Sequence, residues 1–211
     1  MVSGAELSGE AAMALLTCSR EYTRICEASS RLGTVTTTGE LGTLIAREIS
    51  GYTLFDLQVI GGRLNREVDN LPSPYREQIR PYFIEQLFGM HHTLLHLHRT
   101  GAFRKMHSPV RDPATLRSYC EMIPPGCFSW DDGKEKGAFG YIPYHRLFYY
   151  LISGFTMFVL EKPGHPVGTP FPGGFKVEEK SGDFLCPIRD KEKDVFFSIC
   201  NFCPATQSDI P

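Results

Sequence analysis

At 211 residues, with 42% hydrophobic residues and 15 phenylalanines, the chain can bury one core of ordinary size without covalent cross-links. The formal net charge is −2, acidic and basic residues are interspersed, and no long basic run occurs, which argues against nucleic acid or a membrane as a partner. The seven cysteines are an odd number and residues 1–10 lack the pattern of a signal peptide, so we expect reduced thiols in a cytoplasmic protein.

The N-terminal part of the chain is expected to be helical. A helical pattern covers Gly9 to Arg31 and gives way to a threonine-rich linker. Thr37 and Glu40 have the spacing of a capping box, which predicts the start of a second helix, and Gly51 should end that helix. Thr53 is expected to cap a third helix.

The third and fourth helices contain glycine and proline at informative positions. Gly61-Gly62 lies within the third helix and is expected to permit close packing of helices. Ser73-Pro74 predicts the start of the fourth helix, because proline at the first helical position loses no hydrogen bond. That helix is expected to extend to about Arg99, and Pro81 should kink it or mark its true beginning.

Histidines are concentrated in this fourth helix. His92 and His96 are separated by one helical turn, a spacing that metal ligands use. Position 93 is threonine, so the HExxH motif of metalloproteases is absent. We therefore interpret these histidines as residues of the helix surface or of the packed core.

The middle of the chain predicts one short helix, a loop and one apolar helix. Asp112-Pro113 begins the short helix, which Pro124-Pro125-Gly126 should close. Residues 128–139 are rich in charge and glycine and are expected to form a surface loop. The apolar helix over 143–161 should be the centre of the core. Its apolar run, 147–160, is shorter than the roughly 20 residues that span a membrane.

The C-terminal part differs in composition from the helical part. The segment His165–Phe175 is so rich in proline and glycine that we expect neither helix nor regular strand there. Residues 175–179 and 184–188 flank Lys180-Ser-Gly-Asp and predict a β-hairpin. The expected fold class is mainly α (α+β), a multi-helix domain with a small C-terminal β-hairpin.

The expected domain organisation is simple. Residues 1–36 are interpreted as an N-terminal helical extension, and residues 37–211 as a single helical domain. Within this domain, residues 163–205 form a cysteine-rich segment that we expect to bind a metal ion.

Three cysteines lie close together near the C-terminus and predict a zinc site. Cys200 and Cys203 are separated by two residues, a spacing that lets two thiolates face one ion, and Cys186 on the predicted hairpin can approach from the other side. Ordinary buried thiols are the alternative interpretation. An iron–sulfur cluster is a further alternative, because the sequence Cys-x-x-Cys-Pro also occurs at such clusters.

Tetrahedral zinc needs a fourth ligand, and three residues are candidates. His165 is preferred, because it enters the same segment on a rigid proline- and glycine-rich loop. Cys127, expected in a loop, and Cys120 are the alternatives. A protein ligand in the fourth position would make the zinc structural, whereas a bound water would leave it open for catalysis.

The C-terminal residues carry a resemblance to a known family. GHPVGTPFPGGFKV, residues 164–177, and CPIRDKEKDVFFSICNFCPA, residues 186–205, resemble the signature end of an archaeal family, domain of unknown function 2115, which is associated with methanogens. The likeness covers about Leu41 to Ala205. It implies an intracellular archaeal protein and supports treating His165 and the three cysteines as one site, but it implies no activity.

Two functions from different classes remain open. In the first, the zinc is structural and the chain works by binding a protein or small-molecule partner. In the second, the metal keeps an open position and the chain is an enzyme, with His165, Glu178 or Glu179 in acid–base catalysis. The first is preferred, because thiolate-rich zinc sites are usually structural.

Overall fold

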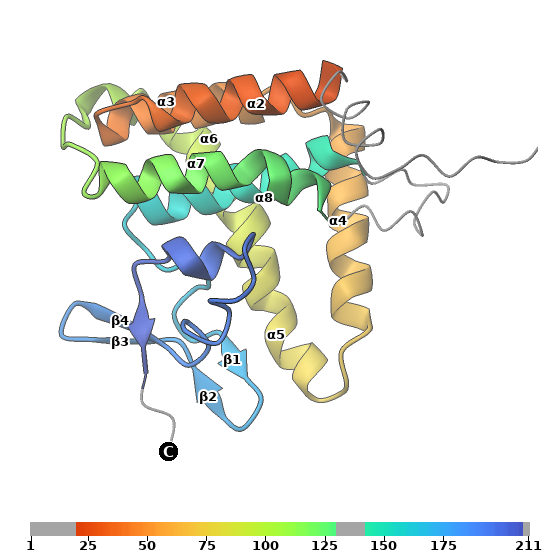
Figure 1. Cartoon of the computed structure of the whole chain (residues 1–211). Coiled ribbons are helices and arrows are strands. Elements are labelled where there is room, and N and C mark those ends of the chain that lie inside the picture. The colour runs from red at the N-terminus through yellow and green to blue at the C-terminus, as the bar shows by residue number, and fades with distance from the viewer. Residues whose placement is uncertain (1–19, 130–141, 209–211) are drawn as a thin grey trace, which may run out of the picture.

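The computed structural model describes residues 20–129 and 142–208, and within these ranges the chain is mainly α-helical (Figure 1). Short strands occur in the C-terminal segment, so the predicted fold class is confirmed. The predicted loop over 128–139 lies almost wholly outside the described residues. The helical elements in chain order are α2 (Arg20–Gly33), α3 (Thr38–Ile49), α4 (Leu54–Asp69), α5 (Tyr75–Ile84), η1 (Glu85–Gly89), α6 (Met90–Arg99), η2 (Ala102–Lys105), α7 (Pro113–Phe128), α8 (Pro143–Gly154), η3 (Phe155–Val159) and η4 (Ile199–Phe202).

Predicted helix starts are confirmed by their capping hydrogen bonds. The Thr37 hydroxyl accepts a hydrogen bond from the backbone N–H of Glu40 at 3.2 Å, and the Glu40 carboxylate accepts one from the N–H of Thr37 at 3.2 Å. Thr53 and Asp56 form the same reciprocal pair at the start of α4. Asp112 caps α7 by accepting from two N–H groups of the first turn. These side chains satisfy donors that a helix start leaves without partners.

The fourth predicted helix is a continuous run from Tyr75 to Arg99, made of α5, the π-helix η1 and α6. Pro74 is the N-cap residue of this helix, whereas it was predicted to be the first helical residue. Pro81 lies inside α5 and does not mark the start of the helix. A proline cannot donate a hydrogen bond to the preceding turn, and the π-helix that follows changes which side chains face the core.

The end of α7 differs from the prediction. The helix continues through Pro124-Pro125-Gly126 and ends at Phe128. Proline already has a helical φ, and the hydrogen bonds that the two prolines lose are offset by burial of Ile123 and Cys127. The predicted stop was therefore wrong, and Cys127 lies in a helix rather than in a loop.

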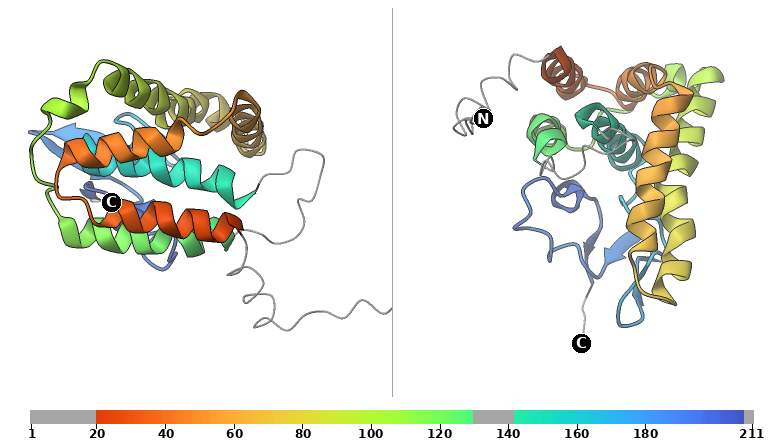
Figure 2. Two further views of the ribbon diagram at one scale, coloured as in Figure 1. Left: turned by 90° about the horizontal axis from the view of Figure 1, so that it is seen from above. Right: turned by 90° about the vertical axis from the view of Figure 1, so that its right-hand side faces the viewer.

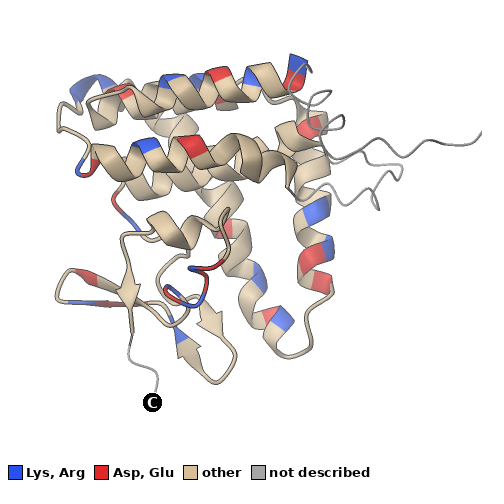
Figure 3. Ribbon diagram, viewed as in Figure 1, with Lys and Arg blue, Asp and Glu red and all other residues tan. Residues whose placement is uncertain are grey.

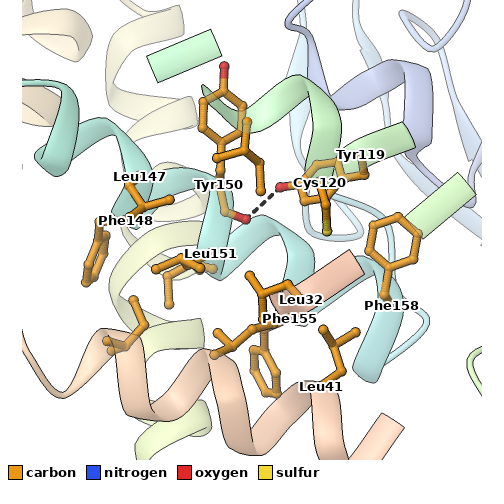
Figure 4. Close-up of a cluster of buried hydrophobic side chains, with 14 of the residues drawn as sticks. Leu32, Leu41, Tyr119, Cys120, Leu147, Phe148, Tyr150, Leu151, Phe155 and Phe158 are labelled. Atoms are coloured by element: carbon orange, nitrogen blue, oxygen red, sulfur yellow. Dashed lines mark hydrogen bonds between the residues drawn. The ribbon is translucent and has the colours of Figure 1, made fainter. Parts of the chain in front are cut away.

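The hydrophobic core lies where α2 and α3 pack against α7, α8 and η3 (Figure 2). Leu32, Leu41 and Phe155 gather in this cluster, and the hydroxyl of Tyr119 donates to the carbonyl of Tyr150 at 2.6 Å (Figure 4). Most residues of α8 and all residues of η3 are buried, which confirms the predicted central place of the apolar helix.

Charged residues of both signs are spread over the helices (Figure 3). In that view basic and acidic residues both occur along α2, α4 and α5. This mixture agrees with a net charge of −2. Within the described ranges, no helix is long and apolar enough to cross a membrane.

Two small antiparallel hairpins form the strands of the C-terminal segment. β3 (Glu178–Lys180) pairs with β4 (Asp183–Cys186), as predicted. β1 (Pro170–Phe171) pairs with β2 (Phe175–Lys176), a two-residue ladder in a segment where no strand was expected. Gly173 and Gly174 between them have φ of +89° and +82°, so the turn uses conformations that glycine adopts readily. β5 (Thr206–Gln207) pairs with β4 in parallel.

The C-terminal segment packs beneath α7 and beside α5 (Figures 1 and 2). The ring of Phe202 in η4 lies 5.3 Å from the ring of Tyr119 in α7. The hydroxyl of Tyr75 in α5 donates to the carbonyl of Pro170 in β1 at 3.2 Å. These contacts bring the cysteine-rich segment against the helical part of the fold.

Candidate functional site

The fold brings the three C-terminal thiols into one neighbourhood. Cys186 ends β4, Cys200 lies in η4, and Cys203 follows η4 directly. The Cys203 thiol raises the pKa of both other thiols, and Cys186 raises that of Cys200. Cys186 and Cys200 are 14 positions apart in sequence, and the pairing of β4 with β5 helps to bring the chain that follows Cys203 back beside Cys186.

Backbone N–H groups lie near the thiol of Cys186. Burial raises the pKa of this thiol, whereas the nearby N–H groups of Ile188 and Arg189 and the positive charge of Arg189 lower it. Such donors stabilise a thiolate relative to a thiol. The turn after β4 thus partly offsets the effect of burial on the thiol of Cys186.

Cys200 and Cys203 occupy the two ends of a short 3-10 turn. Ser198 begins this turn, and its hydroxyl accepts a hydrogen bond from the N–H of Cys200 at 3.3 Å. The sulfur of Cys203 accepts a hydrogen bond from the N–H of Gly164 at 3.4 Å. Burial raises the pKa of Cys200 to about 11, so this thiol is protonated at neutral pH unless a cation binds it.

His165 follows Gly164, whose N–H contacts Cys203, so the preferred fourth ligand enters the same region. The imidazole lies edge-on to the ring of Phe171, with centroids 5.6 Å apart. Burial lowers the pKa of His165 to about 4, which keeps the ring neutral at neutral pH, the form that binds metals. The ring also lines a cleft that Cys200 borders.

The alternative cysteine ligands lie elsewhere. A methyl group on Gly33 of α2 would be 3.4 Å from Cβ of Cys120, which places Cys120 at the contact of α2 with α7. Burial raises the pKa of Cys127, and Glu21 and Cys26 of α2 raise it further. Cys120 therefore packs against the N-terminal helix and Cys127 lies near it, in contrast to the three C-terminal thiols.

Across the described residues, no three His, Cys, Asp or Glu side chains are already spaced as ligands of one metal ion. Cys186 and Cys203 pack in one small cluster, but the three thiols do not come together closely enough to form such a group. The predicted histidine pair on α6 is also not part of such a group. Its neighbour His91 packs against Phe148, with ring centroids 5.3 Å apart.

A cleft of about 490 Å³ lies between the C-terminal segment and the helices α4, α5, η1 and α8. Its walls are largely apolar and aromatic, and polar groups come from several elements. One side is formed by the helices, with Leu64, Phe83, Gln86, Leu87, Arg146 and Tyr149, and the other by the tail, with His165, Ile188, Glu192, Phe197 and Cys200.

Two polar residues of this cleft were not found from the sequence. Gln86 in η1 is only 9% exposed, and within the described part of the chain its side chain forms no hydrogen bond. Glu192, in the loop before η4, is half-buried, and among the described residues its carboxylate has no ion-pair partner. Neither residue belongs to a sequence motif, so only the fold brings them together.

A second arrangement missed from the sequence joins the starts of α4 and α8. Nε2 of His145 lies 2.9 Å from Oδ1 of Asp56, and Nδ1 accepts a hydrogen bond from the N–H of Ile142 at 3.2 Å. The bond to Ile142 leaves the ring proton on Nε2, so Nε2 donates to the carboxylate. Both side chains are largely buried between helix ends, which indicates a structural link.

Comparison with known proteins places the chain in a family. Residues 37–208 match the family described as "Uncharacterized protein conserved in archaea (DUF2115)". A UPF0305 protein of Methanothermobacter thermautotrophicus is 47% identical over 57 residues, 27% of this chain and 37% of that relative. A UPF0305 protein of Methanocaldococcus jannaschii is 22% identical over 177 residues, 81% of this chain and 96% of that relative.

Coverage differs between these relatives. The match spans little more than a third of the Methanothermobacter protein, whereas it spans nearly the whole Methanocaldococcus protein. A UPF0305 protein of Methanococcus maripaludis is 26% identical over 160 residues, 75% of this chain and 90% of that relative. No solved structure matches the chain significantly. Because the family match runs from residue 37 to residue 208, the chain belongs to the archaeal DUF2115 family.

Proposed function

We propose that the protein is a binding protein of the reducing cytoplasm, whose C-terminal segment is locked by a structural zinc ion on Cys186, Cys200, Cys203 and His165. The observation that carries this proposal is that Cys186 and Cys203 pack in one small cluster and that Cys200, in the turn before Cys203, is close enough to both for their charges to raise its pKa. His165, whose ring is kept neutral by burial and lines the same cleft as Cys200, would complete a donor set of three sulfurs and one nitrogen, which suits tetrahedral zinc.

Arg189 supplies a test of whether the residues fit a metal-bound thiolate. Its Nε is buried and, among the described residues, has no hydrogen-bond partner. A buried guanidinium nitrogen without an acceptor is unfavourable. The guanidinium of Arg189 pairs with Asp190 at 3.5 Å through another nitrogen, and its charge lowers the pKa of Cys186, so a thiolate there would offer an acceptor near Nε. This fit supports a site that is complete when Cys186 is ionised.

Zinc binding would be coupled to the packing of the tail. Burial favours the protonated thiols, and the ion must displace their protons. The described side chains do not form a group of three that could hold a metal ion, so zinc binding would have to draw the turn after β4 and η4 together. The tail residues Ile188, Glu192 and Phe197, which form one wall of the cleft, would then be fixed in place.

One observation favours an enzyme as the second candidate. Cys200 and His165 both border the cleft, so a zinc ion with an open position could meet a bound substrate there. The other predicted acid–base residues are less suitable. Glu178 forms an ion pair with Lys180 at 2.7 Å, and Glu179 is exposed on β3 outside the cleft.

Metal analysis of the protein tests the proposal. The chain is purified without added metal and without oxygen, its metal content is measured by mass spectrometry, and its visible spectrum is recorded. We expect about one zinc per chain and no colour. Cys200→Ser should lose the metal, whereas Cys26→Ser, which changes a half-exposed thiol of α2, should retain it. Iron with sulfide, or no metal in either variant, would overturn the proposal.

Cobalt substitution separates the structural from the catalytic candidate. Co²⁺ in the zinc site reports its coordination in the visible spectrum. If His165 closes the shell, added cyanide should leave the spectrum unchanged and His165→Asn should alter it. A spectrum that shifts with cyanide in the unmodified protein would indicate an open position and favour the enzyme.

A further inference from the structure

Gln86 is a buried polar side chain that folding alone does not explain. It is 9% exposed, and within the described ranges its amide has neither a hydrogen-bond donor nor an acceptor beside it. Its donor and acceptor are therefore not used by the fold and are available to a ligand. The amide is not among the fully enclosed atoms without partners, so it is reached through the cleft that it lines.

The local backbone presents this amide to the cleft. Gln86 lies in the π-helix η1, between α5 and α6. A π-turn accommodates one more residue than an α-turn, which rotates the following side chains and often occurs at functional sites. Leu87, next to it, is buried at 7% exposure and also lines the cleft. The irregular turn therefore directs one polar and one apolar residue to the same cavity.

Glu192 faces the same cleft from the opposite side. It lies in the loop between β4 and η4 and lines the cleft together with Cys200. The neighbouring Lys193 pairs with Asp190 at 2.8 Å rather than with Glu192. An ionised carboxylate only accepts hydrogen bonds, so this wall offers acceptors for N–H groups.

The charges of the cleft are balanced. Arg63 and Arg146 are offset by Glu67 and Glu192, and Arg63 already binds Glu67 at 2.7 Å. Such a site has no excess positive charge for phosphate or for a polyanion. The balance favours an uncharged ligand that carries its own hydrogen-bond donors.

The remaining walls favour a flat ligand. Phe83, Tyr149 and Phe197 contribute aromatic rings from three different elements, and the volume of about 490 Å³ lies in the usual range for small-molecule sites. We propose that this cleft binds a planar, uncharged nitrogen heterocycle whose edge carries an N–H beside a carbonyl, held by Gln86 and Glu192. The inference rests on the proposed binding function and specifies its ligand class.

The chemistry of the two side chains matches that edge. The Gln86 amide offers a donor and an acceptor side by side, which pair with the C=O and N–H of a cyclic amide. Glu192 accepts from a further N–H of the ring. A planar carboxylate would instead bring a second negative charge toward Glu192, and a hydrocarbon would leave the Gln86 amide without partners.

Hypoxanthine, which has a cyclic amide edge and is uncharged at pH 7, is the probe for this site. Its dissociation constant is measured by saturation-transfer NMR on the full-length protein as purified, beside indole, which lacks the carbonyl, and benzoate, which is a planar anion. We expect hypoxanthine to bind more tightly than either. No binding of hypoxanthine, or equal binding of benzoate, would overturn the inference.

Gln86→Leu and Glu192→Gln are the test variants, and Gln58→Leu on the exposed side of α4 is the matched control. Gln86→Leu should weaken hypoxanthine binding about tenfold or more, since one hydrogen-bonded pair is lost. Glu192→Gln should weaken it less, and Gln58→Leu should leave it unchanged. The Tm of Gln86→Leu should equal or exceed that of the unmodified protein. A fall in Tm with unchanged binding would show that the amide is structural and would contradict the inference.

Metal content measured on the same samples separates the two proposals. If the protein holds zinc and does not bind hypoxanthine, this inference fails and the zinc site stands. If hypoxanthine binds to a protein without metal, the cleft stands and the zinc proposal fails.

Discussion

At the scale of single residues, two glycines of the helices differ sharply in what surrounds them. A methyl group added at Gly126 would lie 2.5 Å from the hydroxyl oxygen and 2.9 Å from Cζ of Tyr150. Tyr150 is 1% exposed, and its hydroxyl donates to the Phe197 carbonyl at 3.1 Å, so the ring cannot move without losing that bond. At Gly62 the nearest atom to an added methyl is Nη1 of Arg66 at 4.0 Å.

These surroundings predict opposite effects of the same substitution. Gly126→Ala should lower the free energy of unfolding by about 1–3 kcal/mol, because the methyl overpacks a buried contact. Gly62→Ala should raise it by up to about 1 kcal/mol, because alanine restricts the unfolded chain and favours helix. Urea denaturation of the two variants beside the unmodified protein measures both changes. Equal effects at the two sites would contradict the close approach of Tyr150 to Gly126.

The sequence was least informative about residues whose role depends on what surrounds them in the fold. The prediction that Gly61-Gly62 permits close packing was wrong, since a methyl at Gly61 would meet Phe88 at an ordinary 3.5 Å. The three thiols could be named because cysteine is rare and its spacing is specific. Gln86 could not, because its meaning depends on which side chains of distant elements surround it, and periodicity describes only one element at a time.

At the scale of elements, carboxylates at helix starts link stability to pH. The hydroxyl of Thr115 and the first N–H groups of α7 hold the pKa of Asp112 below its usual value of 3.8. Glu40 and Asp56 at the starts of α3 and α4 also have lowered pKa values, caused mainly by hydrogen bonds from Thr36 and Thr53. A carboxylate with a lowered pKa stabilises the fold above its unfolded pKa and loses that contribution as the pH falls through its folded pKa.

The Tm of the protein should therefore fall as the pH is lowered below about 4, with the loss continuing to lower pH. Asp112→Asn should reduce this fall, because asparagine caps a helix nearly as well and does not titrate. Circular dichroism melts between pH 7 and pH 2.5 measure the slope. Glu121→Gln, an exposed residue of the same helix that caps nothing, is the control and should keep the slope of the unmodified protein. If the Tm of Asp112→Asn falls with pH as steeply as that of Glu121→Gln, the role of Asp112 in this pH dependence would be refuted.

Helix starts were predicted well because a cap is local in sequence. Thr37 with Glu40 is recognisable within four residues, and the structure forms the expected pair of bonds. The end of α7 and the pairing of β4 with β5 were not predicted. The first depends on burial of Cys127 against α2, and the second joins residues such as Leu185 and Thr206 that are distant in sequence.

At the scale of the whole molecule, the family match does not include the N-terminal helix α2. The match begins at residue 37, where the predicted domain also begins. Yet α2 packs along α7, and Ile25 and Leu32 are 0% and 3% exposed within the main core. The division of the chain at residue 36 stays a prediction, but this burial argues that α2 contributes to the stability of residues 37–208.

Removing residues 1–36 should therefore lower the Tm strongly and make the remaining chain prone to aggregation. The reason is that the face of α7 that carries Cys120, which α2 covers, would be exposed. Large-to-small substitutions in a core cost about 2–5 kcal/mol each, and total stability is roughly 5–15 kcal/mol, so losing a whole helix approaches the total. Leu32→Ala in the full chain should lower the free energy of unfolding by about 2–5 kcal/mol, whereas Glu27→Ala on the exposed face of α2 should change it little. Thermal melts and urea titrations compare these three proteins with the unmodified chain. A truncated chain as stable as the full one would show that α2 is a dispensable extension, and the core would then be complete from residue 37 onward.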